Sequence, residues 1–206
     1  MKTLWFDSCM GGFYLALSQL ESSLLKLDSV FFTDGKVANQ VIKTESEKLL
    51  QKNNTKLSEI SYLCLNKGPG SFTGIKLSAS YCLGVKFAQG ENLQLKSYCG
   101  LEELAKVLSK TLVLKSTKTN GFYFNPSAKS PSIVCEDLDD LAHLKDSICW
   151  GIWDEYSSAN QKVDQIPDEQ KKHYLDQMVR RLKTAGVKTL ENFGELQYLK
   201  EPFVGR

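Results

Sequence analysis

The chain has 206 residues, enough to bury a core as one large domain or as two domains of roughly 100 residues each. Hydrophobic residues make up 42% and charged residues 24%, a composition typical of globular proteins and not of disordered or low-complexity chains. The 26 basic and 24 acidic residues leave a net charge of +2, which excludes a general basic field that would hold nucleic acid by itself.

The first half of the chain predicts three initial strands and then an alternation of helices and strands. Gly11-Gly12 favours a hairpin between the first two strands, and the nearly continuous apolar run ISYLCLN is typical of a strand buried on both faces. The predicted elements, in order, are strands at 3–7, 13–18 and 30–34, a helix over 36–52, a strand at 60–66, a helix over 73–88, a strand at 93–98 and a helix over 100–110.

This order of elements resembles the ribonuclease-H-like unit of actin-like (ASKHA) kinases and their relatives. The analogy concerns the fold and settles no function. We therefore expect an α/β protein with an actin-like, ribonuclease-H-like fold, in which two subdomains contain mixed β-sheets flanked by helices. Residues 1–100 are expected to form the first, partner-binding subdomain, and residues 101–206 a smaller, divergent second one.

The clearest signal in the second half is a helix over 167–185. Pro167 suits its first turn and Gly186 its stop, and acidic residues at its start and basic residues at its end match the helix dipole. Core packing explains its apolar stripe, and a solvated face explains its basic residues. The stripe is Leu175, Met178, Val179 and Leu182; the basic residues are Lys171, Lys172, Arg180, Arg181 and Lys183. Strands are expected at 111–116, 121–125, 132–136 and 147–153.

Six cysteines are scattered along the chain without a Cys-x-x-Cys pair, so the spacing of a zinc or redox motif is absent and we expect buried, reduced thiols. The N-terminal segment is interrupted by Asp7 and Gly11-Gly12, and no small-residue cleavage site follows it. No run reaches about 18 apolar residues. We expect a cytoplasmic protein without a membrane partner.

The segment NKGPGSFTGIK at 66–76 carries glycines in the manner of a phosphate-binding loop, but its spacing does not fit. Three residues separate Gly70 from Gly74 where a P-loop has four, the dinucleotide fingerprint would need one residue fewer, and Pro69 has no N–H for an anion nest. A weaker anion role at the helix N-terminus stays open, through Ser71, Thr73 and Lys76. The alternative is a sharp glycine turn in which Ser71 or Thr73 caps the helix.

Small residues recur every fourth position along the helix that follows this loop. Gly74, Ser78 and Cys82 form one stripe, which lets another helix approach closely. The approaching helix can belong to this chain or to another subunit. Since Phe72, Tyr81 and Lys76 are nearby, we favour a contact with another subunit.

Catalytic constellations are scarce in the sequence. The two histidines are His143, which has no recognisable partner, and His173, which falls on the basic helix and is expected to be solvated. Asp7 ends the first strand at the place where actin-like kinases hold a metal-bound nucleotide; the favoured interpretation is that it caps its own turn. We expect no catalytic residue and no metal site.

The segment GPGSFTGIK resembles the GPGSFTG-x-R signature of the bacterial TsaB family, formerly called YeaZ, with seven consecutive identities. Asp7-Ser8 is similar to the Asp-Thr-Ser/Ala end of the family's first strand, and LSEISYLCLNKGPG follows the family's pattern up to the loop. The resemblance covers roughly the first half of the chain. Beyond it only 118–123 and 197–200 are similar, and the chain is short for the family, so a trimmed second subdomain is expected.

The resemblance implies a non-catalytic scaffold. TsaB proteins pair with TsaD, a metal- and nucleotide-dependent enzyme of the same actin-like fold, and with the ATPase TsaE, to place a threonylcarbamoyl group on an adenosine beside the anticodon of certain tRNAs. Their first-subdomain helices form the pairing surface. For this chain the resemblance implies TsaD-like and TsaE-like partners, ATP and a metal in those partners, no cofactor bound by the chain alone, and only indirect contact with tRNA.

The interface residues that we expect follow from this resemblance and from the stripe of small residues. They are Gly68, Pro69, Gly70, Ser71, Phe72, Thr73, Gly74, Lys76, Ser78, Tyr81 and Cys82. Two positions depart from the family pattern: Ala38 stands where relatives often have histidine, and Lys76 replaces an arginine whose forked donors a lysine cannot reproduce.

Two further possibilities stay open. A homodimer can form through the 73–88 helix. The alternative function is a small actin-like ATP-binding kinase or hydrolase that uses Asp7 and the 68–74 loop, with Asp7, Ser71, Thr73 and Lys76 as nucleotide or anion contacts. Relatives were formerly labelled as peptidases, but this sequence offers no recognisable set of catalytic residues for a peptidase.

Overall fold

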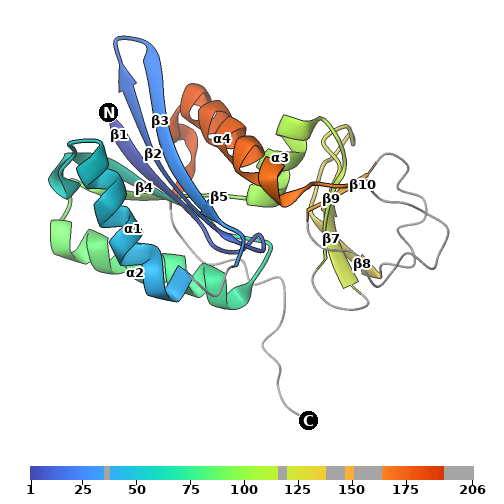
Figure 1. Ribbon diagram of the computed structural model, residues 1–206. Helices are drawn as coiled ribbons and strands as arrows, with labels where there is room; N and C mark the ends of the chain where they lie inside the picture. Colours follow the sequence, from blue (N-terminus) through green and yellow to red (C-terminus); the bar gives the residue numbers. More distant parts are fainter. Residues whose placement is uncertain (35–37, 116–119, 138–146, 151–163, 193–206) are drawn as a thin grey trace. The chain divides into compact units, whose positions relative to one another are not determined.

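The computed structural model describes residues 1–34, 38–115, 120–137, 147–150 and 164–192 (Figure 1). The chain divides into two compact units. The first consists of residues 1–99 and the chain from residue 179 onward, and the second of residues 100–178. Each unit combines a β-sheet with helices.

The first unit contains a six-stranded sheet and two helices that follow strands along the chain. Its strands are β1 (Lys2–Asp7), β2 (Phe13–Glu21), β3 (Leu24–Phe32), β4 (Ile60–Asn66), β5 (Gln94–Tyr98) and β11 (Glu191–Asn192), in the order β11-β5-β4-β1-β2-β3, and its helices are α1 (Ala38–Lys52) and α2 (Phe72–Gln89). β1 pairs antiparallel with β2 and parallel with β4, which in turn pairs parallel with β5. This topology confirms the predicted meander followed by alternating helices and strands.

The two helices α1 and α2 lie side by side across one face of this sheet (Figure 1). Successive side chains of a strand point to opposite faces, so Leu4 and Phe6 of β1 join the apolar core beneath these helices together with Leu63 and Leu65 of β4. Trp5 points to the other face, where its indole Nε1 donates to Ser18 Oγ at 2.8 Å. The inner strands are therefore buried on both faces, as the apolar run of β4 predicts.

The third strand is longer than predicted and starts earlier. The turn before it, Ser22-Ser23, has positive φ at both residues (46° and 76°), as in a tight two-residue hairpin. Residues 30–32 of the strand predicted at 30–34 belong to β3, and its start was missed because Lys26 and Asp28 interrupt the apolar pattern upstream. β3 is an edge strand, where charged side chains are tolerated and protect against pairing with other chains.

The second unit contains a five-stranded sheet and helix α3 (Gly100–Leu108). Its strands are β6 (Leu112–Lys115), β7 (Asn120–Phe124), β8 (Val134–Asp137), β9 (Ile148–Cys149) and β10 (Asp164–Gln165), in the order β10-β9-β6-β7-β8. The strands predicted at 111–116, 121–125 and 132–136 correspond to β6, β7 and β8. Of the strand predicted at 147–153, residues 148–149 form β9, and residues 151–153 lie outside the described part of the chain.

Helix α4 (Asp168–Ala185) confirms the predicted helix over 167–185. Its predicted apolar stripe is buried, and Gly186 follows its end with a φ of +101°. Two members of the predicted solvated basic face are buried instead: Lys171 and Lys183 are each only 6% exposed. Lys183 Nζ donates to Thr3 Oγ1 at 2.8 Å and to the Met1 carbonyl at 3.3 Å, which explains how the sheet accommodates this ammonium group.

The boundary between the units near residue 100 agrees with the predicted division into 1–100 and 101–206, but the chain from residue 179 onward returns to the first unit and not to the second. β11 pairs antiparallel with β5, with Glu191 opposite Ser97 and Asn192 opposite Lys96. Buried Lys96 holds this segment, since its Nζ donates to the carbonyls of Lys188 and Leu190 and to Asn192 Oδ1. A long-range strand pairing of two residues leaves no pattern in the sequence.

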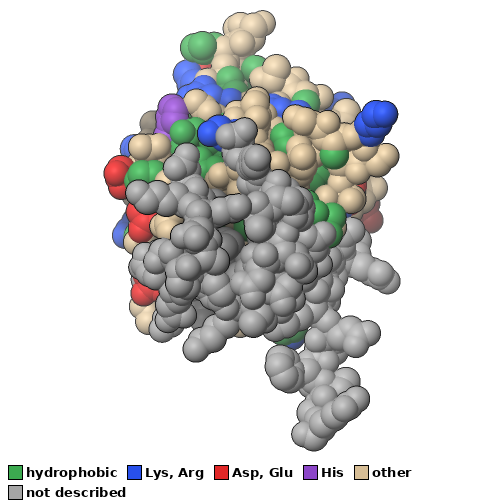
Figure 2. Space-filling view, turned by 90° about the vertical axis from the view of Figure 1, so that its right-hand side faces the viewer, with side chains coloured by type: hydrophobic (Ala, Val, Ile, Leu, Met, Phe, Trp, Pro, Cys, Tyr) green, Lys and Arg blue, Asp and Glu red, His purple; other side chains and the backbone are tan. Residues whose placement is uncertain are grey.

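Charged side chains of both signs are interspersed over the described part of the face shown in Figure 2, in agreement with the small net charge. Within the described residues, no helix is both long enough and apolar enough to cross a membrane.

Burial lowers the pKa of the Lys183 ammonium, and this makes a testable prediction about stability. Between the lowered pKa in the folded state and the ordinary value of about 10.4, the unfolded chain binds more protons, so this lysine stabilises the fold increasingly as the pH rises. We expect the free energy of unfolding of the wild type to increase relative to Lys183→Met between pH 7 and pH 10, measured by urea denaturation. Lys188→Met, at an exposed position, is the control. A difference that stays constant with pH would contradict the interpretation.

Candidate functional site

The candidate site is formed where the turn after β1 meets the loop between β4 and α2. Asp7, at the end of β1, is 2% exposed. Its Oδ1 accepts hydrogen bonds from the backbone N–H of Cys9 (3.0 Å) and of Met10 (3.4 Å), and its Oδ2 accepts one from Asn66 Nδ2 at 2.8 Å. Asn66 in turn accepts the N–H of Gly68 on its Oδ1 at 3.0 Å. The side chain that ends β1 thus joins its own turn to the loop.

Two opposing effects act on the Asp7 carboxyl. Burial raises its pKa, and the hydrogen bonds from Asn66, Cys9 and Met10 lower it, with burial the larger effect. Burial also raises the pKa of the Cys9 thiol, whose Sγ lies 3.4 Å from Asp7 Oδ1. The interpretation of Asp7 as a cap of its own turn is confirmed, because both of its oxygens accept hydrogen bonds from the chain itself.

Glycine is required at two positions of the GPGSFTG segment because backbone passes close to them. A Cβ atom on Gly70 would lie 2.1 Å from the carbonyl oxygen of Cys9, and one on Gly74 would lie 1.6 Å from the carbonyl oxygen of Ser8. The N–H of Ser71 donates to the Cys9 carbonyl at 2.7 Å. The segment is therefore a sharp turn, and the turn between β1 and β2 packs directly against it.

The helix after the loop begins as predicted. Ser71 is the N-cap of α2, and its Oγ accepts the N–H of Gly74 at 3.2 Å. This supports the structural interpretation of the loop, in which the glycines shape the turn and the hydroxyl caps the helix.

The stripe of small residues faces this chain's own fold, which corrects the prediction that another subunit approaches it. Ser8 Oγ lies 2.6 Å from the Gly74 carbonyl and 2.6 Å from Ser78 Oγ. Ser78 is 1% exposed, and Cys82 is fully buried in the apolar core. The element that approaches the thin face of α2 is the end of β1 and its turn, so these three residues are not available to a partner. A substitution there acts on the fold.

The opposite side of α2 carries large side chains that are exposed. Phe72 is 48% exposed, Leu83 47% and Phe87 93%. Lys76 is exposed beside them, and its Nζ lies 4.1 Å from the centroid of the Phe72 ring. We call Phe72, Lys76, Ser80, Leu83 and Phe87 the α2 outer face. Exposed apolar side chains that gather on one side of a helix indicate a contact surface for another protein.

The remaining predicted site residues divide between buried and exposed positions. Gly68 and Pro69 are buried, Tyr81 is half-buried with its ring 5.7 Å from that of Phe6, and Gly70, Ser71, Phe72, Thr73 and Lys76 are exposed. The four predicted nucleotide or anion contacts are therefore not presented together, because Asp7 is buried while Ser71, Thr73 and Lys76 lie at the surface.

Other candidate chemistry is sparse within the described residues. His173 is exposed, as predicted, with its Nε2 2.8 Å from Gln177 Nε2, and His143 lies outside the described part of the chain. Within that part, no three His, Cys, Asp or Glu side chains are grouped so as to hold a metal ion. The five cysteines whose side chains are described are buried and form no disulfide, as predicted: Cys9, Cys64, Cys82, Cys99 and Cys149.

Sequence reasoning missed Leu83 and Phe87 as surface residues. The signal is present, because Phe72, Leu83 and Phe87 lie eleven and four residues apart and so share one side of a helix. The stripe of small residues on the other side of the helix was interpreted as the contact surface instead. Large residues on one side and small ones on the other are expected when the small side packs against backbone.

The topology and this site define a protein with an actin-like, ribonuclease-H-like fold. Among solved structures, the chain is similar to YeaZ from Pseudomonas aeruginosa, with 15% identity and a TM-score of 0.65, over 90% of this chain and 93% of that one. It is also similar to a protein described as uncharacterized with similarity to the peptidase YeaZ from Pseudomonas aeruginosa, with 14% identity and a TM-score of 0.66, over 95% and 99% of the chains. No protein-family model and no curated protein matches the sequence.

These similarities show a YeaZ-like fold that extends through both halves of the chain. The sequence resemblance had covered roughly the first half. The alignment spans 93% and 99% of the two solved chains. Compared with these two chains, the second subdomain is therefore not trimmed, contrary to the expectation.

The close approach at Gly74 predicts a large loss of stability on substitution. Gly74→Ala places a methyl group against the Ser8 carbonyl, and we expect it to lower the free energy of unfolding by about 2–4 kcal/mol in urea denaturation. The matched control is Gly84→Ala in the same helix, where nothing lies within 4 Å of the added atom. It should stabilise the protein by about 0.5–1 kcal/mol through helix propensity. Equal effects of the two variants would refute the packing argument.

The hydrogen bonds around Asp7 predict coupling with Asn66. In Asp7→Asn the new amide N–H group faces a donor, either Asn66 Nδ2 or the turn N–H groups, and we expect a loss of about 1–3 kcal/mol. Adding Asn66→Asp restores an acceptor opposite that amide and still accepts the Gly68 N–H. The double variant should therefore recover most of the loss, measured as a double-mutant cycle by thermal or urea unfolding. Strictly additive losses would contradict this arrangement.

Proposed function

We propose that this protein is a non-catalytic scaffold subunit of the machinery that makes N6-threonylcarbamoyladenosine in tRNA. In this role it pairs with a TsaD-like catalytic subunit and increases that subunit's activity, and a TsaE-like ATPase completes the assembly. The YeaZ-like fold and the GPGSFTGIK segment support the proposal, because both resemble the TsaB family.

The observation that carries the proposal is the α2 outer face. The helix that follows the signature segment exposes Phe72, Leu83 and Phe87, while its other side is occupied by the chain itself. Burying a Leu or Phe side chain against a partner contributes about 1.5–3 kcal/mol, so three such residues can anchor a stable contact. The pairing surface is therefore this face and not the stripe of small residues.

In the proposed role, the residues of this chain have structural functions. Asp7 and the GPGSFTG loop position the start of α2, and the reaction is assigned to the partner, which supplies the ATP and the metal. This chain is proposed to bind no cofactor by itself and to meet tRNA only through the assembly. The proposed setting is the cytoplasm.

Pairing with the TsaD-like protein of the same cell tests the proposal. Leu83→Asp puts a carboxylate at the centre of the α2 outer face, and we expect it to weaken the pairing by at least about 1.5 kcal/mol, roughly tenfold, in calorimetric titration. The matched control is Leu20→Asp in β2, since Leu20 and Leu83 have the same exposed fraction of 47%.

The control variant should pair like the wild type, and circular dichroism should show both variants folded. Absence of pairing by the wild-type protein would overturn the proposed function. Pairing that both variants retain would overturn the assignment of the surface.

A further inference from the structure

The last described segment of the chain lies along the edge of the first sheet. It comprises residues 186–192, which we call the strap, and it consists of Gly186, a short 3-10 turn (Val187–Thr189), Leu190 and β11. Val187 is fully buried, whereas both residues of β11 are exposed and polar. Apolar packing therefore fixes the start of the strap, and polar contacts hold its end.

Two buried lysines of the first unit provide these polar contacts. Lys96 of β5 is 7% exposed, and its Nζ donates to the Leu190 carbonyl at 3.2 Å and to Asn192 Oδ1 at 2.8 Å. Lys67, the residue after β4, is 9% exposed and forms an ion pair with Glu191. A buried ammonium group without acceptors is strongly unfavourable. The strap therefore supplies acceptors that both lysines need in their buried positions.

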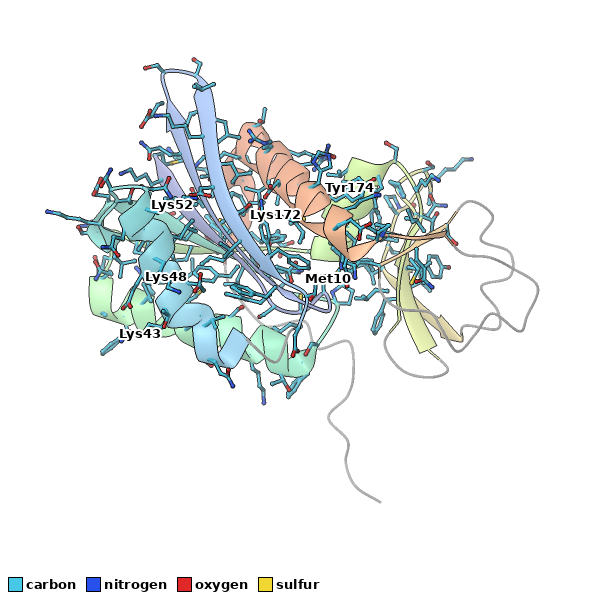
Figure 3. All side chains as sticks on the ribbon, in the orientation of Figure 1. Met10, Lys43, Lys48, Lys52, Lys172 and Tyr174 are labelled. Atoms are coloured by element: carbon cyan, nitrogen blue, oxygen red, sulfur yellow. The ribbon has the colours of Figure 1, made fainter. Side chains whose placement is uncertain are left out.

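The lysines of α1 show how differently an ordinary surface ion pair is placed. Lys43, Lys48 and Lys52 lie along this helix in Figure 3, and their side chains are 77%, 65% and 70% exposed although each is paired with a carboxylate. Such pairs contribute little to stability, because water solvates both charges whether or not they are paired. The Lys67 side chain is only 11% exposed, so its charge depends on Glu191 as long as the strap is in place.

Lys67 also joins the strap to the loop that begins α2. Its backbone N–H donates to the Tyr98 carbonyl at 2.9 Å, and the GPGSFTG segment begins at the next residue, Gly68. This segment leads directly to Ser71, the N-cap of α2. A change at Glu191 therefore reaches, through one side chain, the loop on which the start of α2 depends.

The strap can open without unfolding of the sheet. β11 pairs with β5 over two residues only, Glu191 with Ser97 and Asn192 with Lys96. When β11 leaves, water replaces the protein acceptors at both lysines, and exchanging a protein hydrogen bond for one to water changes the free energy only modestly. Short exposed segments that are held in this way open at a free energy well below that of global unfolding.

We propose that residues 186–192 are a releasable strap whose opening is coupled to the GPGSFTG loop through the Lys67–Glu191 ion pair. With the strap closed, Lys67 is held at both its backbone and its side chain. With the strap open, the side chain turns to water and the loop moves more freely. The start of α2 is thus controlled by a residue 124 positions further along the chain than Lys67. This device goes beyond the proposed function and does not depend on it.

Hydrogen–deuterium exchange of the full chain tests the coupling, because both segments contain hydrogen-bonded N–H groups. The loop reporters are the N–H groups of Lys67, Gly68 and Ser71, and the strap reporters are those of Thr189 and Leu190.

Glu191→Gln removes the charge of this side chain and keeps its shape. We expect exchange to become at least about threefold faster at both the strap and the loop reporters, as expected for the loss of one partly exposed ion pair. The matched control is Glu91→Gln, at an exposed position outside the strap and the loop, and it should change neither set of reporters. Circular dichroism should show that both variants are folded.

Asn192→Ala separates coupling from a direct effect on the loop, because Asn192 Oδ1 accepts its hydrogen bond from Lys96 of β5, outside the loop. Coupling predicts that the loop reporters also exchange faster in this variant. Reversing the ion pair is a second test. Lys67→Glu and Glu191→Lys should each speed exchange at the loop, and the double variant should return to the wild-type rates.

Faster exchange that stays confined to the strap in Glu191→Gln and Asn192→Ala would overturn the proposal, and so would strap reporters that Glu191→Gln leaves unchanged. A double variant as fast as the single reversals would also contradict it. If Lys67→Glu prevents folding, Glu191→Gln and Asn192→Ala still decide the question. None of these measurements involves the TsaD-like protein, so their outcome is separate from that of the proposed function.

Discussion

The buried carboxylate of Asp7 determines how the N-terminal half of this protein is assembled. It ends the central strand β1, accepts the N–H groups of its own turn and binds Asn66 at the end of β4. The turn held in this way lies against Gly70 and Gly74, where no side chain would fit. Since α2 begins at this point, the orientation of the whole helix depends on the same contact.

The consequence is a helix with two dissimilar sides. Small residues face inward because backbone of the β1–β2 turn packs on them, and large residues are left on the outside. A signature that has the glycines of a phosphate-binding loop thus serves to place an apolar, positively charged surface. The proposed scaffold role would use that surface for pairing.

Much of the fold could be predicted from the sequence because the first half is built from regular signals. The apolar run of β4, the hairpin glycines and the helical spacing in α2 each identify an element, and their order identifies the actin-like topology. Two features could not be predicted. The pairing of β11 with β5 involves two residues and leaves no periodic pattern, and charged residues within β3 obscured the start of that strand.

The candidate site shows a similar limit. The spacing of Gly74, Ser78 and Cys82 correctly predicted a close approach to α2, but spacing alone does not say which element approaches. The structure identifies it as the end of β1, and this moves the proposed interface to the other side of the helix. Likewise, Lys183 on a predicted polar face is buried, because α4 packs against Thr3 of the sheet.

Hydrogen–deuterium exchange with and without the TsaD-like protein tests the central claim most directly. The account predicts that the partner slows exchange in peptides from the second half of α2, which carries Leu83 and Phe87, and leaves the buried turn at 7–10 unchanged. Slower exchange confined to that turn and to the 66–71 loop, with α2 unaffected, would contradict it.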